Sequence, residues 1–182
     1  MSLRIVGGAF RGRILKSPKS DNTRPTTSML REAVFNICSQ QIEGARFLDL
    51  FAGSGAMGFE ALSRGANFAT FIERDSHAAQ CIKENAALLG VEAKVQLFKA
   101  PVLKVLPRLE GPYDLIYIDP PYAQETLHIL AAIHQHRLLA PEGTLFLEER
   151  YEGQADFTHT PFQLINSRRY SNTHLHQFKA GS

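Results

Sequence analysis

Residues 47–58 read FLDLFAGSGAMG, an apolar strand followed by a glycine-rich turn and the start of a helix. Gly53, Gly55 and Gly58 fit the G-x-G-x-x-G pattern of a dinucleotide-binding crossover. Glycine suits such a turn because the backbone bends sharply and a ligand can approach without meeting a Cβ atom. The stretch therefore predicts an α/β fold with a parallel sheet, in which one strand ends at this turn.

Two acids near the ends of predicted strands indicate which ligand the turn binds. Asp49 lies four residues before Gly53, and Glu73 ends the next apolar run, 20 residues after Gly53. An acid at the first position repels a pyrophosphate but suits the ammonium group of S-adenosylmethionine, which also carries a sulfonium and no phosphate. An acid at the second position can accept hydrogen bonds from both ribose hydroxyls. The pair favours S-adenosylmethionine over a nicotinamide dinucleotide.

A second motif predicts the chemistry. Residues 114–122 read DLIYIDPPY, an apolar strand that ends in an acid, two prolines and Tyr122. Two consecutive prolines remove two backbone donors, so this corner presents acceptors only. The Asp119 carboxylate and the Pro120 carbonyl can each accept a hydrogen bond from a planar amine, and a base can stack on Tyr122. The residues could also simply end a strand, but together with the glycine turn they predict methylation of an exocyclic amine, with Asp119, Pro120 and Tyr122 as catalytic residues.

Composition and length predict one globular domain. The 182 residues are 44% hydrophobic and 21% charged, which is ordinary for a globular protein. The two cysteines, Cys38 and Cys81, lie far apart, and the spacing of His134 and His136 does not suit a shared ligand, so no disulfide framework and no metal are expected. No apolar run reaches the length of a membrane span and no signal peptide is apparent, so a cytoplasmic enzyme is expected.

Positive charge gathers at the amino terminus. Residues 1–31 hold seven lysines and arginines against one acid, a net charge of +6, although the whole chain carries only +2. Such a segment can be a solvated tail, but its alternation with apolar residues favours a β-hairpin that contacts nucleic acid. The RNA-binding residues expected from it are Arg4, Arg11, Arg13, Lys16 and Arg24.

The chain is expected to alternate strands and helices after an amino-terminal extension. The extension comprises a hairpin over 3–15, turning at Gly7-Gly8 or Gly12, and a helix capped by Thr26 or Thr27, with an apolar face of Leu30, Ala33, Val34 and Ile37. Later helices are expected from the glycine turn to 64, over 76–89, 101–108 and 124–139, and strands up to 73 and over 94–98, 114–119, 144–148, 162–170 and 173–179.

This pattern predicts a mostly parallel seven-stranded sheet with an antiparallel carboxy-terminal hairpin. Residues 1–182 would form a single methyltransferase domain, with 1–40 as the basic extension and 41–182 as the catalytic core. Asp49, Glu73 and Asp119 would then share the carboxyl rim of the sheet, where open α/β sheets bind ligands.

With these motifs the chain resembles the Rossmann-like class I S-adenosylmethionine-dependent methyltransferases. Within them it is most similar to the RsmD family, which methylates the exocyclic N2 of a guanine in small-subunit (16S) ribosomal RNA. The likeness spans nearly the whole chain and rests on RIVGG at 4–8, RGR at 11–13, RPTT at 24–27, DLFAGSG at 49–55, EALSRGA at 60–66, DPPY at 119–122 and SRRY at 167–170.

The resemblance implies a monomeric enzyme whose partner is 16S rRNA, within a small ribosomal subunit or an assembly intermediate. The expected cofactor, S-adenosyl-L-methionine, would contact Asp49, Phe51, Ala52, Gly53, Gly55, Glu73, Arg74, Ala100 and Asp119. One position departs from related enzymes, which often carry Asp or Asn where this chain has Lys99. Because Lys99 cannot accept a hydrogen bond from the adenine amine, backbone groups around Phe98 to Ala100 are expected to replace it.

Other functions remain open. A nicotinamide oxidoreductase would explain the glycine pattern but gives no role to Asp49 or Asp119. An amino-methyltransferase could instead act on adenine or cytosine in DNA, or on a protein glutamine amide. The basic segment argues against a protein substrate, and 182 residues leave no separate DNA-recognition domain. The acids on one rim argue against a non-enzymatic RNA-binding module.

Overall fold

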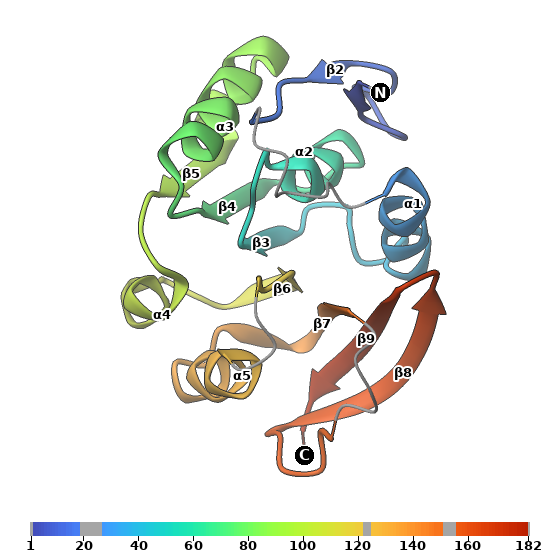
Figure 1. The fold of residues 1–182 in the computed structure, drawn as a ribbon, viewed down its shortest axis with the longest axis vertical. Helices are drawn as coiled ribbons and strands as arrows, with labels where there is room; N and C mark the ends of the chain where they lie inside the picture. Colours follow the sequence, from blue (N-terminus) through green and yellow to red (C-terminus); the bar gives the residue numbers. More distant parts are fainter. Residues whose placement is uncertain (1, 19–26, 122–124, 151–155, 182) are drawn as a thin grey trace.

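A seven-stranded sheet forms the centre of the protein in a computed structural model that describes residues 2–18, 27–121, 125–150 and 156–181 (Figure 1). Its strands, in order across the sheet, are β5 (Val95–Phe98), β4 (Phe68–Ile72), β3 (Arg46–Leu50), β6 (Tyr113–Ile118), β7 (Leu139–Arg150), β9 (Thr173–Ala180) and β8 (Phe162–Tyr170). The first five are parallel, while β9 runs antiparallel to both β7 and β8. The predicted sheet with its antiparallel carboxy-terminal hairpin is confirmed.

Helices cover both faces of the parallel part of the sheet, as its apolar strands require. One face carries α1 (Ser28–Ile37), α2 (Ala56–Ser63) and α3 (Ser76–Leu89); the other carries α4 (Val102–Val105) and α5 (Thr126–Gln135), as Figure 1 shows. Short 3-10 turns, η1 (Glu92–Lys94) and η2 (Leu106–Arg108), follow α3 and α4. No helix in the described ranges is long and apolar enough to cross a membrane.

Alternation along the strands divides the buried side chains between two clusters. Phe47, Phe71 and Tyr117 pack with the helices α1 to α3, whereas Leu48 and Ile116 pack with α4 and α5. Each strand therefore aims its odd-numbered or even-numbered residues at a known face, which fixes the directions of the polar side chains near the strand ends.

Capping residues are found at two helices, and one of them, Thr27, was predicted from the sequence. The Thr27 hydroxyl accepts a hydrogen bond from the Leu30 N–H, and α1 begins one residue later. Asp75 caps α3 through the Ala78 N–H, and Gly90, with φ of 67°, ends it. Sequence and structure therefore agree closely on the bounds of α3.

The inner face of α1 differs in part from the prediction. Leu30 and Val34 are buried as expected, but Phe35 and the Arg31 side chain are buried as well, and the other two predicted residues, Ala33 and Ile37, are only half-buried. Arg31 donates to the Arg4 carbonyl, so a charged residue on this face serves to fix the amino-terminal segment.

The predicted hairpin over 3–15 exists, and Ile5 continues its pairing by donating to the Arg13 carbonyl and accepting from the Gly12 N–H. The strands β1 (Leu3–Arg4) and β2 (Ile14–Leu15) are antiparallel, and the chain reverses through hydrogen-bonded turns over 8–13 in which Gly12 has a φ of 82°, so the turn lies at Gly12 and not at Gly7-Gly8. The reason is that the Val6 and Gly7 N–H groups donate to the Glu60 carboxylate on α2 instead of across the hairpin.

Two predicted bounds after β6 are wrong. The helix expected over 124–139 ends at Gln135, and the strand expected to start at 144 already begins at Leu139. Arg137 adopts a positive φ of 51°, which stops the helix, and the Tyr113 N–H then donates to the Leu138 carbonyl at 2.7 Å. The chain thus enters the sheet before the Pro141-Glu142-Gly143 segment that was expected to separate the two elements.

Candidate cofactor and substrate site

Three predicted acids meet at one rim of the sheet. Asp49 is the last but one residue of β3, Glu73 directly follows β4, and Asp119 directly follows β6. The strands β4, β3 and β6 are parallel neighbours, so their carboxyl ends lie together. The structure therefore brings together the acids that the sequence selected separately.

Asp49 is the most deeply placed of the three. Its Oδ2 accepts a hydrogen bond from the Gly58 N–H at 3.1 Å, in the first turn of α2. Burial raises the pKa of Asp49 well above its usual range, and the nearby Asp119 and Glu73 carboxyls raise it further, against the lowering effect of Gly58. A cationic ligand group at this position would relieve that cost, whereas an anionic one would increase it.

The glycine turn leaves open space beside Gly53. Phe51, Gly53 and Gly55 all have positive φ, at 60°, 56° and 81°. A Cβ atom built on Gly53 would meet no atom within 4 Å, whereas one on Gly58 would lie 2.3 Å from the Phe71 ring. Gly58 therefore serves the packing of α2 on the sheet, and Gly53 borders a space that a ligand can fill.

Glu73 supports the same turn. Its Oε2 accepts the Gly53 N–H and its Oε1 accepts the Asp75 N–H, both at 2.8 Å. Because a carboxylate has about four acceptor positions, these two bonds leave capacity for the hydroxyls of a ribose. The Glu73 carboxylate is thus linked to the turn that borders the open space.

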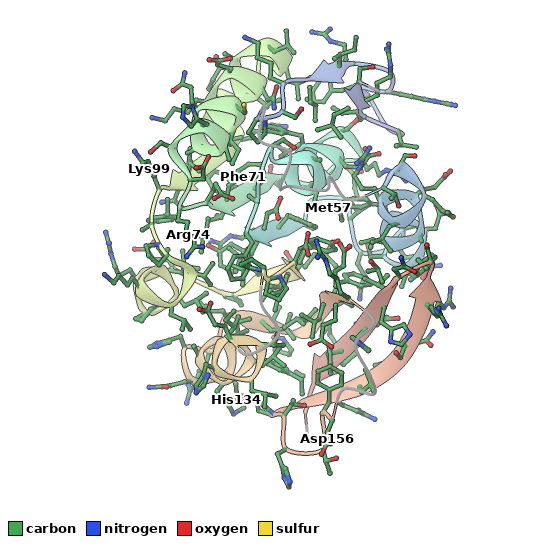
Figure 2. The ribbon with its side chains drawn as sticks, in the orientation of Figure 1. Met57, Phe71, Arg74, Lys99, His134 and Asp156 are labelled. Atoms are coloured by element: carbon green, nitrogen blue, oxygen red, sulfur yellow. The ribbon has the colours of Figure 1, made fainter. Side chains whose placement is uncertain are left out.

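The residues expected near an adenine follow the paired ends of two strands. Ile72 of β4 pairs with Phe98 of β5, so Arg74 and Ala100 come two residues beyond this pair. Figure 2 shows Arg74 and Lys99 on the same side of the molecule, and both side chains are exposed. That backbone groups around Phe98 to Ala100 contact the adenine stays a prediction.

The carboxyl group of Asp119 has a perturbed pKa. Burial, and then the Glu148 carboxylate, raise the pKa of Asp119 to about 8, while Arg150 opposes them. The other predicted catalytic residue, Tyr122, and the RNA-binding candidate Arg24 lie outside the described residues. Glu148 was missed by the sequence analysis, although it follows an apolar run just as Asp119 does.

The basic side chains of the extension lie at the surface. Arg4, Arg11, Arg13 and Lys16 are all exposed. Arg4 donates to the Gly12 carbonyl, Arg13 to the Leu88 carbonyl, and Lys16 pairs with Glu84 at 2.6 Å. Exposed contacts of this kind are weak, so these groups can exchange them for phosphates.

A buried carboxylate that the sequence analysis missed holds the extension in place. Glu60, completely buried in α2, accepts the Val6 and Gly7 N–H groups at 2.9 and 2.7 Å and the Arg64 side chain at 2.9 Å. Ser63 adds a bond from its hydroxyl to the Gly7 carbonyl. An acid among the apolar residues of a helix was the available signal. Through these contacts the extension is bound to the helix that follows the glycine turn.

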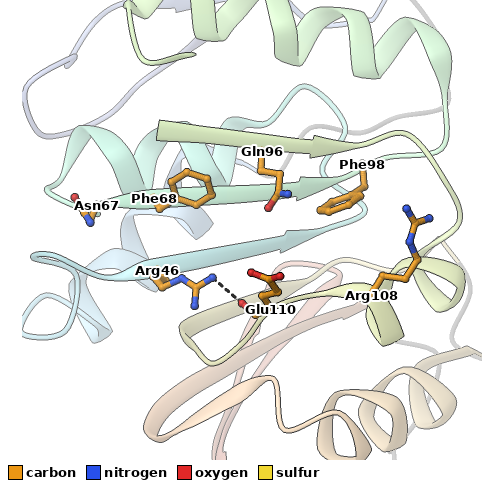
Figure 3. Close-up of a pocket in the computed structure, with 7 residues that line it drawn as sticks. All are labelled: Arg46, Asn67, Phe68, Gln96, Phe98, Arg108 and Glu110. Carbon is orange, nitrogen blue, oxygen red and sulfur yellow. Dashed lines mark hydrogen bonds between the residues drawn. The ribbon is translucent and has the colours of Figure 1, made fainter. Parts of the chain in front are cut away.

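A separate hollow of about 580 Å³ lies over β3, β4 and β5 (Figure 3). Its described lining residues are Arg46, Asn67, Phe68, Gln96, Phe98, Arg108 and Glu110. Arg46 donates there to the Glu110 and Pro112 carbonyls and lies over the Tyr113 ring. Because the rim acids are not among these residues, the hollow is distinct from the candidate site, and Arg46 anchors the chain that leads into β6.

Comparison with known proteins identifies the family of this chain. The family model described as Conserved hypothetical protein 95 matches residues 3–179. Ribosomal RNA small subunit methyltransferase D of Escherichia coli K12 is 37% identical over 154 residues, which cover 82% of this chain and 76% of that protein. YlbH of Bacillus subtilis is 33% identical over 171 residues, 92% of each protein.

The fold agrees with the same relationship. The solved structure of the Escherichia coli protein yhhF superposes with a TM-score of 0.89 at 31% identity, over 99% of this chain and 98% of that one. The sheet order and the flanking helices are those of the Rossmann-like class I methyltransferases. The chain therefore belongs to the Conserved hypothetical protein 95 family, the RsmD family that its motifs resemble.

Proposed function

We propose that the protein transfers a methyl group from S-adenosylmethionine to the exocyclic N2 of a guanine in small-subunit (16S) ribosomal RNA. The observation that carries the proposal is the meeting of Asp49, Glu73 and Asp119 around an open glycine turn. The name of the Escherichia coli relative, a small-subunit ribosomal RNA methyltransferase, supports the RNA substrate. We further propose that the enzyme works as a cytoplasmic monomer on the small subunit or an assembly intermediate.

The charge of the rim fits S-adenosylmethionine better than a dinucleotide. Three acids, one of them fully buried, would repel a pyrophosphate but attract an ammonium and a sulfonium. Asp49 would hold the ammonium group and Glu73 the ribose hydroxyls. Phe51, Ala52, Gly53 and Gly55 would line the turn, and Arg74 and Ala100 would flank the adenine. When bound, the cofactor supplies an electrophilic methyl group.

Asp119 and Pro120 would prepare the amine. The N2 lone pair of guanine is delocalised into the ring, so the amine is a poor nucleophile. Two acceptors that hold both N–H bonds favour a pyramidal nitrogen and stabilise the positive charge that it develops, which lowers the barrier more than it strengthens binding. With a pKa of about 8, Asp119 can afterwards accept the departing proton. Tyr122 would stack on the base.

The biological test is mass mapping of 16S rRNA from a strain that lacks this gene. We expect one N2-methylguanine to disappear, to return with the wild-type gene, and to stay absent with an Asp119→Ala gene. An unchanged rRNA, accompanied by loss of methyl groups from a glutamine side chain of a protein, would replace the proposal with a protein amide methyltransferase.

RNA docking by the extension can be measured through salt dependence. Arg11→Ala with Arg13→Ala should weaken binding to small-subunit RNA and reduce the slope of log K against log salt by about one unit per charge, because fewer counterions are released. The affinity for S-adenosylmethionine should stay the same. Salt titrations of the double variant and the wild type provide the measurement.

A matched control removes two charges from the opposite face of the sheet. Lys104→Ala with Arg108→Ala changes exposed residues of α4 and η2. It should leave the slope of the wild type unchanged. Equal slopes for all three proteins would show that the extension does not contact phosphates.

A further inference from the structure

Glu148 lies beside Asp119 at the rim. Ile118 of β6 pairs with Leu147 of β7, so Asp119 and Glu148 are the next neighbours across this parallel pair. Alternation points both side chains to the face of Tyr117 and Phe146, because Ile118 and Leu147 pack on the opposite face. The effect of Glu148 on the pKa of Asp119 agrees with this closeness.

A buried tyrosine fixes the Glu148 carboxylate. Tyr117, which is 1% exposed, donates its hydroxyl hydrogen to Glu148 Oε2. The Glu148 carboxylate is thus an oriented acceptor on the strand next to Asp119 and Pro120.

Planar amines differ in the atom next to the amino group. Guanine carries N1–H beside its N2 amine, which makes two adjacent donors. Adenine and cytosine carry a ring nitrogen acceptor beside their amine, and a glutamine amide carries its carbonyl oxygen there. Two carboxylates side by side accept from the two guanine donors, whereas the lone pairs of the other substrates would face the second carboxylate.

We propose that Glu148 selects guanine by accepting a hydrogen bond from its N1–H while Asp119 and Pro120 hold the N2 amine. Glu148 is then a specificity-determining residue, and Tyr117 is a positioning residue that orients it. This inference rests on the proposed function, and it explains how the site would reject the other planar amines that suit Asp119 and Pro120.

The test uses 2-aminopurine, which has the same amine as guanine but no hydrogen on N1. Two oligouridine RNAs, one with a single central guanosine and one with a single central 2-aminopurine, are bound to the protein in the presence of S-adenosylhomocysteine. We expect the wild type to bind the guanosine RNA about tenfold more tightly. Glu148→Gln should bring the ratio of the two dissociation constants close to one, because an amide can turn to donate or to accept.

Two further variants separate selection from folding. Tyr117→Phe removes only the hydroxyl and should give a ratio between those of the wild type and Glu148→Gln. Glu149→Gln is the matched control, since Glu149 follows Glu148 on β7, faces the other way and lies 3.5 Å from His176. It should keep the tenfold ratio. All variants should bind S-adenosylhomocysteine with the affinity of the wild type.

The outcomes distinguish this inference from the proposed function. A wild-type ratio near one, or a tenfold ratio retained by Glu148→Gln, would overturn the role of Glu148 even if the protein binds S-adenosylhomocysteine and methylates small-subunit particles. A protein that does neither would overturn the proposed function itself.

Discussion

Asp119→Ala should lower the single-turnover rate of methyl transfer to small-subunit particles at least about a hundredfold, the usual cost of removing one preorganised partner of a transition state. The variant loses an acceptor for the amine but keeps Asp49 and Glu73, so the affinity for S-adenosylmethionine should change far less. Rapid-quench kinetics and calorimetry measure the two effects separately. Turnover close to that of the wild type would rule out the amine-holding role.

The control for Asp119→Ala is an acid remote from the rim. Asp156 is exposed and lies before β8, at the far end of the molecule in Figure 2. Asp156→Ala removes the same type of side chain and should keep the wild-type rate.

The raised pKa of Asp119 adds a pH dependence to the same experiment. The ionised carboxylate accepts hydrogen bonds, so the rate should rise with pH and level off above about 8. Asp119→Asn should be slow and should lack this rise. A wild-type rate that does not change between about pH 6 and 8 would contradict the assignment.

Whereas the rate should rise with pH, the contribution of Asp119 to the free energy of unfolding should fall as the pH rises. The folded pKa of about 8 lies above the ordinary value of 3.8, so the folded protein binds more protons than the unfolded chain between these values. The free energy of unfolding contributed by this group is therefore fully present below about pH 4 and falls as the pH rises toward 8. Denaturant titrations at pH 5 and 8 should show a smaller loss in Asp119→Asn than in the wild type.

Glu73→Ala should weaken the binding of S-adenosylmethionine by about 1–3 kcal/mol, which corresponds to roughly fivefold to 150-fold. The variant loses the acceptor for the ribose hydroxyls and also the bonds from the Gly53 and Asp75 N–H groups. Glu73→Gln keeps one acceptor oxygen, so its affinity for S-adenosylmethionine should lie between those of Glu73→Ala and the wild type. Calorimetry measures the affinities.

Two comparisons make the Glu73 experiment specific. Glu92→Ala changes an exposed acid of η1 and should leave the affinity unchanged. NAD and NADP should not bind to any of the proteins. Tight binding of NAD without binding of the methyl donor would contradict the cofactor assignment.

Local signals explain which parts of the fold could be predicted. The bounds of α3 follow from two residues at its ends. The Asp75 side chain accepts a hydrogen bond from the first turn, and Gly90 ends the helix in a left-handed conformation. The end of α5 could not be placed in the same way. Arg137 takes its positive φ where the chain leaves α5 and turns into β7, which pairs with β6. Such a bound depends on tertiary contacts, which spacing alone does not contain.

The candidate site shows the same division. Asp49, Glu73 and Asp119 were found because each lies at or just after the end of an apolar run, and the same rule would have found Glu148 after 144–147. That Glu148 lies beside Asp119, however, depends on the order and register of β6 and β7. The role of Glu60 could not be predicted from local signals, because its partners Val6 and Gly7 lie more than 50 residues away in the sequence.

The Glu60 contacts limit how this protein can be engineered. A graft of residues 2–18 onto another methyltransferase would separate the Val6 and Gly7 N–H groups from Glu60, and the Gly7 carbonyl from the Ser63 hydroxyl, unless an equivalent acid and serine are supplied on the recipient helix. Each unpaired group would cost about 1–3 kcal/mol where it is shielded from water. The extension is therefore not an interchangeable module, and a chimera has to exchange it as one block with α2 and the turn that precedes it.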